Sequence, residues 1–154
     1  MDCRQCRRTR NHLKLEPNIR VTLAMIDRNH GIPPSATARY DVYLRRYNEL
    51  TKDNVFFWDY YADFTNFLIP TPNTDMIPHA MKTYRKFGLH GVFVQLPFGS
   101  LGDFVDYRTW LTSQLLWNPD QDAGKLKQEF FTHFYGSAAA QMLAYLDLLH
   151  TARD

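Results

Sequence analysis

The sequence predicts an α/β fold in which three parallel βα units are followed by a helical segment. Three short runs of apolar, β-branched and aromatic residues recur, and their first valines, Val21, Val55 and Val92, stand 34 and 37 residues apart. Apolar residues at helical spacing lie between these runs, and the last third of the chain has helical patterns only. Alternation of strands and helices is typical of a parallel sheet.

The predicted strands span 19–25, 55–60 and 92–96, and each is almost continuously apolar. A half-exposed strand alternates between apolar and polar residues, whereas a strand of a parallel sheet is apolar on both sides. We therefore expect these three strands to be covered on both faces.

Two helices are expected within the repeating units, over 36–50 and 74–87. Asn73 or Thr74 can cap the beginning of the second helix, because their short polar side chains accept from free backbone N–H groups. Gly88 ends it, as glycine does at many helix C-termini.

Three more helices are expected in the rest of the chain. The first spans 103–116 and is stopped by the segment that contains Pro119. Asp122 begins the next, which ends at Gly136, and Ser137 caps the last.

Units of about 35 residues occur both in doubly wound sheets and in (β/α)₈ barrels. A whole barrel needs about 250 residues, and three parallel strands alone have two unpaired edges. The sequence therefore favours the closing part of a (β/α)₈ (TIM) barrel. We expect a basic N-terminal arm (1–18), a partial barrel (19–117) and C-terminal helices packed on it (118–154). No glycine-rich phosphate loop follows any strand, and no cofactor is expected.

The composition excludes several classes of protein. The chain has 154 residues, of which 45% are hydrophobic and 22% charged, and its formal net charge is +2. Disordered chains are less hydrophobic and more highly charged, and no apolar run approaches the roughly 18 residues of a membrane span. The first residues contain no apolar segment of a secretory signal, so the sequence itself leaves the location open.

The N-terminal arm is basic. Residues 1–20 contain six basic and two acidic side chains, or 6 − 2 = +4. Such an arm can contact phosphates, but neither interleaved aromatic residues nor a DNA-binding motif accompanies it, so no nucleic-acid partner is expected.

Cys3 and Cys6 form a lone CxxC pair. With His12 they supply three of the four ligands of a zinc site, and no thioredoxin-like strand precedes them, so we expect no metal and leave their role open. The other histidines singled out are expected at the surface: His79, His90, His133 and His150.

Five motifs occur in a fixed order along the chain: VFFWDYYADF (55–64), PTPN (70–73), GVFVQ (91–95), LLWNPD (115–120) and FYGSAA (134–139). Together they resemble the bacterial glycoside-hydrolase-like family catalogued as domain of unknown function 4838, which includes glycoside hydrolase family 163. The resemblance covers about residues 13 to 150. Cys3 and Cys6 also resemble a cysteine-rich stretch that members of this family carry just before this region.

The resemblance implies a barrel from an exported bacterial protein with endo-β-N-acetylglucosaminidase activity on N-glycans. It implies a substrate-assisted retaining mechanism, in which the acetamido group is the nucleophile and a carboxylate pair orients it and protonates the leaving oxygen. That pair is expected upstream of this chain. The chain alone would then supply one wall of the sugar site and would be inactive. It would also either self-associate or need a covering chain. The alternative is a non-catalytic carbohydrate-binding or scaffold derivative of the same fold.

Active sites of barrels lie where the strands end. The candidate glycan-binding residues at the ends of the predicted strands are Asp27, Arg28, His30, Trp58, Asp59, Tyr60 and Gln95. We expect Asp27, Asp59 and Gln95 to lie at one end of three neighbouring parallel strands.

Alternation along the second strand places Trp58 and Tyr60 on one face and Asp59 on the other. A tryptophan can form an apolar wall against a sugar ring, and the resemblance suggests that the Tyr60 hydroxyl holds the acetamido carbonyl. The alternative is that both aromatic residues belong to the core.

The remaining candidates each have two interpretations. Asp59 either orients a substrate hydroxyl or has a local role, as a cap or as the partner of a neighbouring arginine. Gln95 binds either a sugar hydroxyl or a neighbouring side chain. The loop with Asp27, Arg28 and His30 either contacts the ligand or is locked by an Asp–Arg pair.

Overall fold

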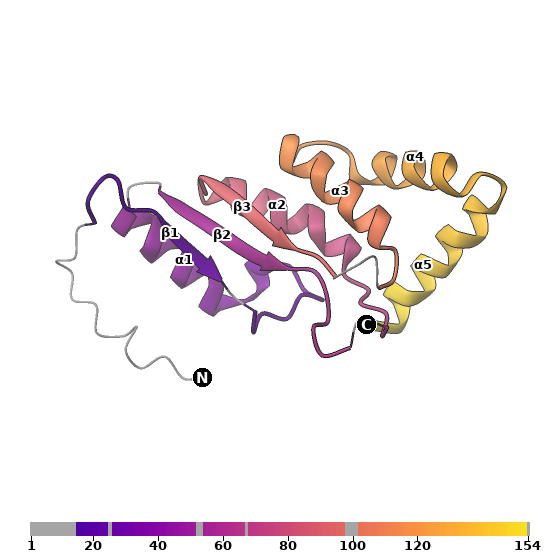
Figure 1. Ribbon diagram of the computed structural model, residues 1–154, viewed down its shortest axis with the longest axis horizontal. Coiled ribbons are helices and arrows are strands. Elements are labelled where there is room, and N and C mark those ends of the chain that lie inside the picture. The colour runs from indigo at the N-terminus through magenta and orange to yellow at the C-terminus, as the bar shows by residue number, and fades with distance from the viewer. Residues whose placement is uncertain (1–14, 25, 52–53, 67, 98–101, 154) are drawn as a thin grey trace.

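A computed structural model describes residues 15–24, 26–51, 54–66, 68–97 and 102–153 (Figure 1). Most of the basic arm, including Cys3, Cys6 and His12, lies outside these described residues, so the expectations for it are not tested by the structure. The described residues form a three-stranded sheet and five α-helices, and the chain ends in a helix, as the sequence predicts.

The sheet consists of β1 (Val21–Ala24), β2 (Val55–Tyr60) and β3 (Gly91–Gln95) in the order β1-β2-β3. Both pairs are parallel, which confirms the predicted sheet. β1 is shorter than the predicted run because Ile19 belongs to a turn, in which its N–H donates to the Glu16 carbonyl at 2.9 Å.

All five predicted helices are confirmed. They are α1 (Ala38–Thr51), α2 (Ile77–Lys86), α3 (Val105–Trp117), α4 (Ala123–Tyr135) and α5 (Ala139–Arg153). Short 3₁₀ turns precede three of them: η2 (Pro34–Ala36) before α1, η3 (Thr74–Met76) before α2 and η5 (Gly136–Ala138) before α5. No helix among the described residues is long and apolar enough to cross a membrane.

The predicted helix caps have mixed outcomes. Asp122 caps α4, because its Oδ1 accepts from the N–H groups of Gly124 at 2.9 Å and Lys125 at 3.1 Å. Asn73 stands at the beginning of η3 without a capping hydrogen bond, since its Oδ1 accepts from Arg108 instead. Ser137 lies inside η5, so the predicted cap at this position is wrong.

α1 and α2 cover one face of the sheet (Figure 1). Val55, Phe57 and Asp59 of β2 are buried on this side, and the Phe57 ring contacts Tyr40 of α1 and Tyr84 of α2. The hydrophobic core continues from here into α3, α4 and α5 through buried residues that include Leu111, Leu115, Phe130, Phe131 and Leu146.

The other face of the sheet is open. Phe56, Trp58 and Tyr60 of β2 are half-buried there, and Phe93, the register partner of Trp58 on β3, is 56% exposed. No described helix lies over this face (Figure 1). The prediction that both faces are covered is therefore wrong for the described residues: the residues of β2 are apolar on both sides, but these helices reach only one of them.

Candidate functional site

The open face of β2 carries two stacked aromatic rings. The centroids of Trp58 and Tyr60 are 5.9 Å apart and their planes differ by 15°. Phe93 meets Trp58 edge-on at 5.0 Å, and Phe64 meets Tyr60 edge-on at 5.7 Å. We call these four residues the aromatic wall. The alternation of a β-strand places Trp58 and Tyr60 side by side, as the sequence predicts.

Gln95 ends β3 beside Tyr60, its register partner. The Oε1 atom of Gln95 accepts a hydrogen bond from Trp58 Nε1 at 3.1 Å. Of its two predicted roles, the structure shows the contact with a neighbouring side chain. This bond fixes the orientation of the indole, whereas the Tyr60 hydroxyl makes no hydrogen bond with any described residue.

Asp59 points to the opposite side of β2 and forms a buried ion pair with Arg28. Arg28 Nη2 donates to both carboxylate oxygens, at 3.1 and 3.0 Å, and the side-chain exposures are 1% for Arg28 and 0% for Asp59. The Tyr84 hydroxyl donates to the same carboxylate. Of the two roles predicted for Asp59, the structure thus shows the pairing with an arginine. This ion pair also holds the β1–α1 loop in place, because it joins Arg28 of that loop to β2. Asp27 is exposed.

Three buried tyrosines surround this ion pair. Burial raises the pKa values of Tyr40, Tyr61 and Tyr84, and the Asp59 carboxylate raises them further. Burial lowers the pKa of Arg28, the negative charge of Asp59 raises it, and the net shift is upward. The tyrosines therefore stay neutral and the arginine stays charged beneath the aromatic wall.

His30 lies between the ion pair and the aromatic wall. Its Nδ1 is 3.4 Å from Asp59 Oδ1, and its ring stands edge-on to Tyr60 at 6.5 Å. Burial and the Arg28 charge lower the pKa of His30 to about 4, against the opposing effects of Asp59 and the Ile26 backbone. His30 is therefore a neutral imidazole near pH 7.

This pKa predicts a pH dependence of stability. The folded protein binds a proton at His30 less readily than the unfolded chain does. The contribution of the neutral His30 to the free energy of unfolding is therefore fully present above pH 6.5, the unperturbed pKa, and is lost as the pH falls toward 4. With allowance for solvent access to the ring, we expect a loss on the order of 2 kcal/mol. Urea denaturation of wild type and His30→Gln across this range measures it. His150 titrates in both proteins, so an unchanged difference between them at all pH values would contradict the prediction.

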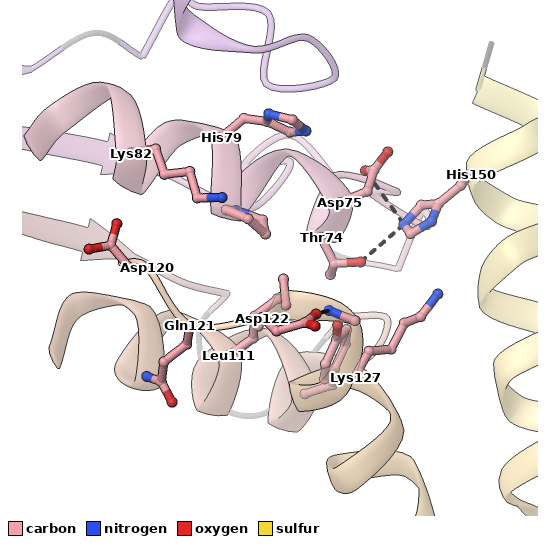
Figure 2. Close-up of a pocket in the computed structure, with 14 residues that line it drawn as sticks. Thr74, Asp75, His79, Lys82, Leu111, Asp120, Gln121, Asp122, Lys127 and His150 are labelled. Atoms are coloured by element: carbon pink, nitrogen blue, oxygen red, sulfur yellow. Dashed lines mark hydrogen bonds and ion pairs between the residues drawn. The ribbon is translucent and has the colours of Figure 1, made fainter. Parts of the chain in front are cut away.

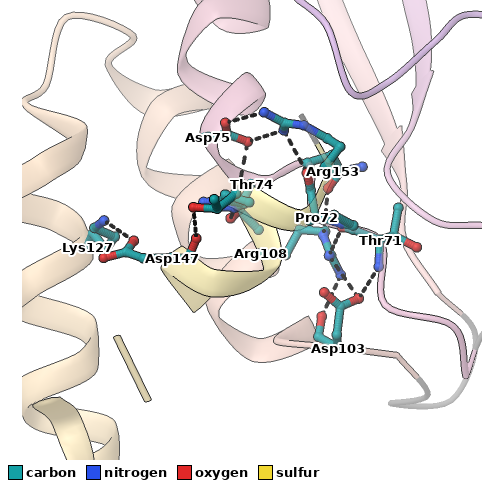
Figure 3. A network of polar contacts seen from close by, with 12 residues as sticks. Thr71, Pro72, Thr74, Asp75, Asp103, Arg108, Lys127, Asp147 and Arg153 are labelled. Carbon is teal, nitrogen blue, oxygen red and sulfur yellow. Dashed lines mark hydrogen bonds and ion pairs between the residues drawn. The ribbon is translucent and has the colours of Figure 1, made fainter. Parts of the chain in front are cut away.

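Two arginines that the sequence analysis did not single out hold the loop between β2 and α2 (Figure 3). Arg108 of α3 is fully buried and donates to Asn73 Oδ1 at 3.1 Å, to the Thr71 carbonyl at 2.8 Å and to Asp103 Oδ1 at 3.2 Å. Burial lowers the pKa of Arg108, and Asp103 opposes this.

Arg153 at the end of α5 is the second arginine. It donates to both carboxylate oxygens of Asp75, at 2.8 and 3.0 Å, and to the Pro72 carbonyl at 2.7 Å (Figure 3). These contacts join segments up to 81 residues apart, and no local sequence pattern predicts them.

Two pockets lie near these loops. The first, of about 320 Å³, is lined by residues 29–31, 62–63 and 70–73 and by Arg153, and we call it the loop pocket. The second, of about 490 Å³, lies between α2, the α3–α4 turn and α5 (Figure 2), and we call it the helix pocket. His150 borders the helix pocket, where its side chain is half-buried and its Nε2 lies 3.0 Å from Thr74 Oγ1. The described residues contain no cluster of three metal-ligating side chains.

The model of a family described as domain of unknown function (DUF4838) matches residues 4–147. No curated protein and no solved structure matches the chain.

Proposed function

Since the chain belongs to the family described as domain of unknown function (DUF4838), we propose that its aromatic wall binds a sugar in a glycoside hydrolase. The sheet would be the closing part of a (β/α)₈ barrel, whose sites lie at the carboxyl ends of the strands. Trp58, Tyr60 and Gln95 stand toward that end of β2 and β3.

The observation that carries the proposal is the stacked pair of Trp58 and Tyr60 on the open face. The C–H groups on one face of a pyranose pack against flat aromatic rings, while its hydroxyls need hydrogen-bond partners. Gln95 holds the indole in place. The Tyr60 hydroxyl, which makes no hydrogen bond with the described residues, is free to donate to the carbonyl of an N-acetyl group.

In the substrate-assisted mechanism that we propose, this chain binds and orients the sugar. The acetamido oxygen attacks the anomeric carbon, and a carboxylic acid protonates the leaving oxygen. Asp59 is not this carboxylic acid, because it is buried on the other side of β2 and its charge is neutralised by Arg28. The carboxylate pair would come from another part of the barrel.

The same position of Asp59 favours a second candidate, a carbohydrate-binding derivative of the fold without catalysis. Both candidates use the aromatic wall, and they differ in whether the whole protein hydrolyses an N-acetylglucosaminide. A turnover measurement on the complete gene product decides between them.

Titration calorimetry with N,N′-diacetylchitobiose tests sugar binding. We expect Trp58→Ala to weaken the affinity at least tenfold, because it removes both the ring surface and the bond to Gln95. Trp117→Ala is the matched control, since this ring is 90% exposed at the end of α3. Equal affinities of wild type and Trp58→Ala would refute the proposal.

The open face also predicts self-association of the chain. Phe93 is exposed, and β1 and β3 are edge strands that can pair with another chain. Sedimentation velocity is expected to show a fraction of dimer that increases with protein concentration. Phe93→Lys should lower this fraction. A monomer at every concentration tested would rule this out.

A further inference from the structure

A third pocket lies between α3 and α4, which pack side by side (Figure 1). It is lined by Trp110 of α3 and by Glu129, Phe130, His133 and Phe134 of α4, and we call it the α3–α4 pocket. It shares no residue with the aromatic wall, the loop pocket or the helix pocket. Its volume of about 250 Å³ is smaller than the roughly 300–1,000 Å³ of sites for drug-sized ligands, so it suits a small head group.

Three aromatic rings form most of this pocket. The centroid of the buried Phe130 ring is 5.4 Å from that of Trp110 and 4.9 Å from that of Phe134. Trp110 is half-buried and Phe134 is 55% exposed, so both rings are accessible from solvent. The face of an aromatic ring attracts a cation that lies within about 6 Å of its centroid. Neighbouring accessible rings therefore offer a surface on which an organic cation can bind.

Two carboxylates add negative charge at this pocket. Glu129 is exposed and forms no ion pair with any described residue. Asp106 stands one turn before Trp110 on α3, is also exposed, and likewise has no ion pair among the described residues. Burial and the Asp106 carboxylate raise the pKa of Tyr135, so the charge of Asp106 reaches the end of α4. Neither carboxylate is neutralised within the part of the chain that the structure describes.

The end of α4 contributes to the same negative potential. Phe134 belongs to the last turn of this helix, where the backbone carbonyls carry partial negative charge. No lysine or arginine among the described residues lines the pocket, and His133 is its one basic side chain. Lys127 of α4 is paired instead with Asp147 of α5, at 3.1 Å. The pocket therefore favours a cation and disfavours an anion.

We propose that the α3–α4 pocket binds the alkylated ammonium head group of a small molecule, with its methyl groups against Trp110 and Phe134 and its charge near Glu129. A bare ammonium group is strongly hydrated, whereas a trimethylammonium group has an apolar surface that packs on the rings and a charge that they attract. The five lining residues enclose a head group and not an extended peptide. The proposal does not depend on the function proposed for the aromatic wall.

Titration of the chain with choline, followed by the indole N–H signals in magnetic resonance spectra, tests this site. We expect the Trp110 signal to shift with a dissociation constant in the millimolar range, because each ring contributes a small attraction. The signals of Trp58 and Trp117 should stay in place. The alcohol 3,3-dimethylbutan-1-ol has the shape of choline without its charge, and we expect it to bind at least about fivefold more weakly.

Phe134→Leu keeps an apolar side chain in the pocket and removes an aromatic ring. It should weaken the affinity for choline about two- to fivefold. Phe93→Leu is the matched control, because Phe93 is 56% exposed and Phe134 is 55% exposed. This control should leave the affinity for choline unchanged. Glu129→Gln should weaken binding about twofold at low salt and have no effect at high salt, where exposed charges are screened.

Glu129→Gln keeps the test available if Phe134→Leu does not fold, since Glu129 is exposed. Equal affinities for choline and the uncharged alcohol would overturn the proposal, because the pocket would then recognise apolar shape alone. An unchanged affinity for choline in folded Phe134→Leu would overturn it as well. A shift confined to Trp58 would place the cation on the aromatic wall, and no shift of Trp110 over the whole titration would show that the pocket binds no such cation. Both results would contradict the proposal.

Discussion

Replacement of Arg28 by methionine is expected to lower the free energy of unfolding by about 3–5 kcal/mol. The guanidinium group is the charge partner of Asp59, whose side chain is fully buried between β2 and the helices. Methionine fills part of the space but leaves the carboxylate with hydrogen bonds from Tyr84 and the Tyr60 backbone and without its guanidinium partner. Urea denaturation of both proteins at neutral pH measures the difference.

Arg85→Met is the matched control for this change. Arg85 also pairs with an aspartate, Asp120, but the two side chains are 59% and 64% exposed. An exposed ion pair contributes at most about 1 kcal/mol. Similar losses in the two variants would contradict the role given to Arg28. The double variant Arg28→Met/Asp59→Leu should recover much of the stability, because no unpaired charge stays buried.

Under the proposed hydrolase function, Tyr60→Phe in the complete protein is expected to lower kcat about a hundredfold, or about 2.7 kcal/mol of transition-state stabilisation. In the proposed mechanism the hydroxyl orients the acetamido group for attack, and its hydrogen bond strengthens as the new ring closes. The folded protein loses no hydrogen bond with a described residue, and the phenyl ring still stacks on Trp58. Turnover of an N-acetylglucosaminide, normalised to folded protein, is the measurement.

Trp58→Ala serves as the comparison. It should raise KM as well, because it removes the surface proposed to lie under the sugar. Replacing a deeply buried tryptophan by alanine lowers the free energy of unfolding by about 3–5 kcal/mol. Trp58 is half-buried, so we expect a smaller loss. An unchanged kcat/KM for Tyr60→Phe would remove this residue from the site.

The sheet is the part of the fold that the sequence predicts best. β2 spans Val55–Tyr60, which is the apolar run seen in the sequence, and the parallel order follows from the helices between the runs. The coverage of the sheet was not predictable in the same way. Apolar residues on both sides of β2 show that both sides avoid water, but not which element covers them.

Within the aromatic wall, the pair of Trp58 and Tyr60 could be predicted because both residues belong to one strand, whereas Phe93 of β3 and Phe64 after β2 were not predicted. Trp58 and Tyr60 are two residues apart, so the pleat alone brings their rings to one face. The contacts beneath and beside the wall depend on distant segments. Arg28 meets Asp59 across 31 residues and Arg108 meets Asn73 across 35, and a single sequence carries no signal that selects these partners.

Magnetic resonance of the chain with N,N′-diacetylchitobiose tests sugar binding by the aromatic wall most directly. We expect nuclear Overhauser effects between the ring protons of Trp58 and Tyr60 and the sugar, with the acetamido methyl close to Tyr60. The indole N–H signal of Trp58, fixed by Gln95, should shift on titration, and that of Trp117 should not. Sugar contacts confined to other residues, with both Trp58 and Tyr60 unperturbed at saturation, would contradict the proposed function.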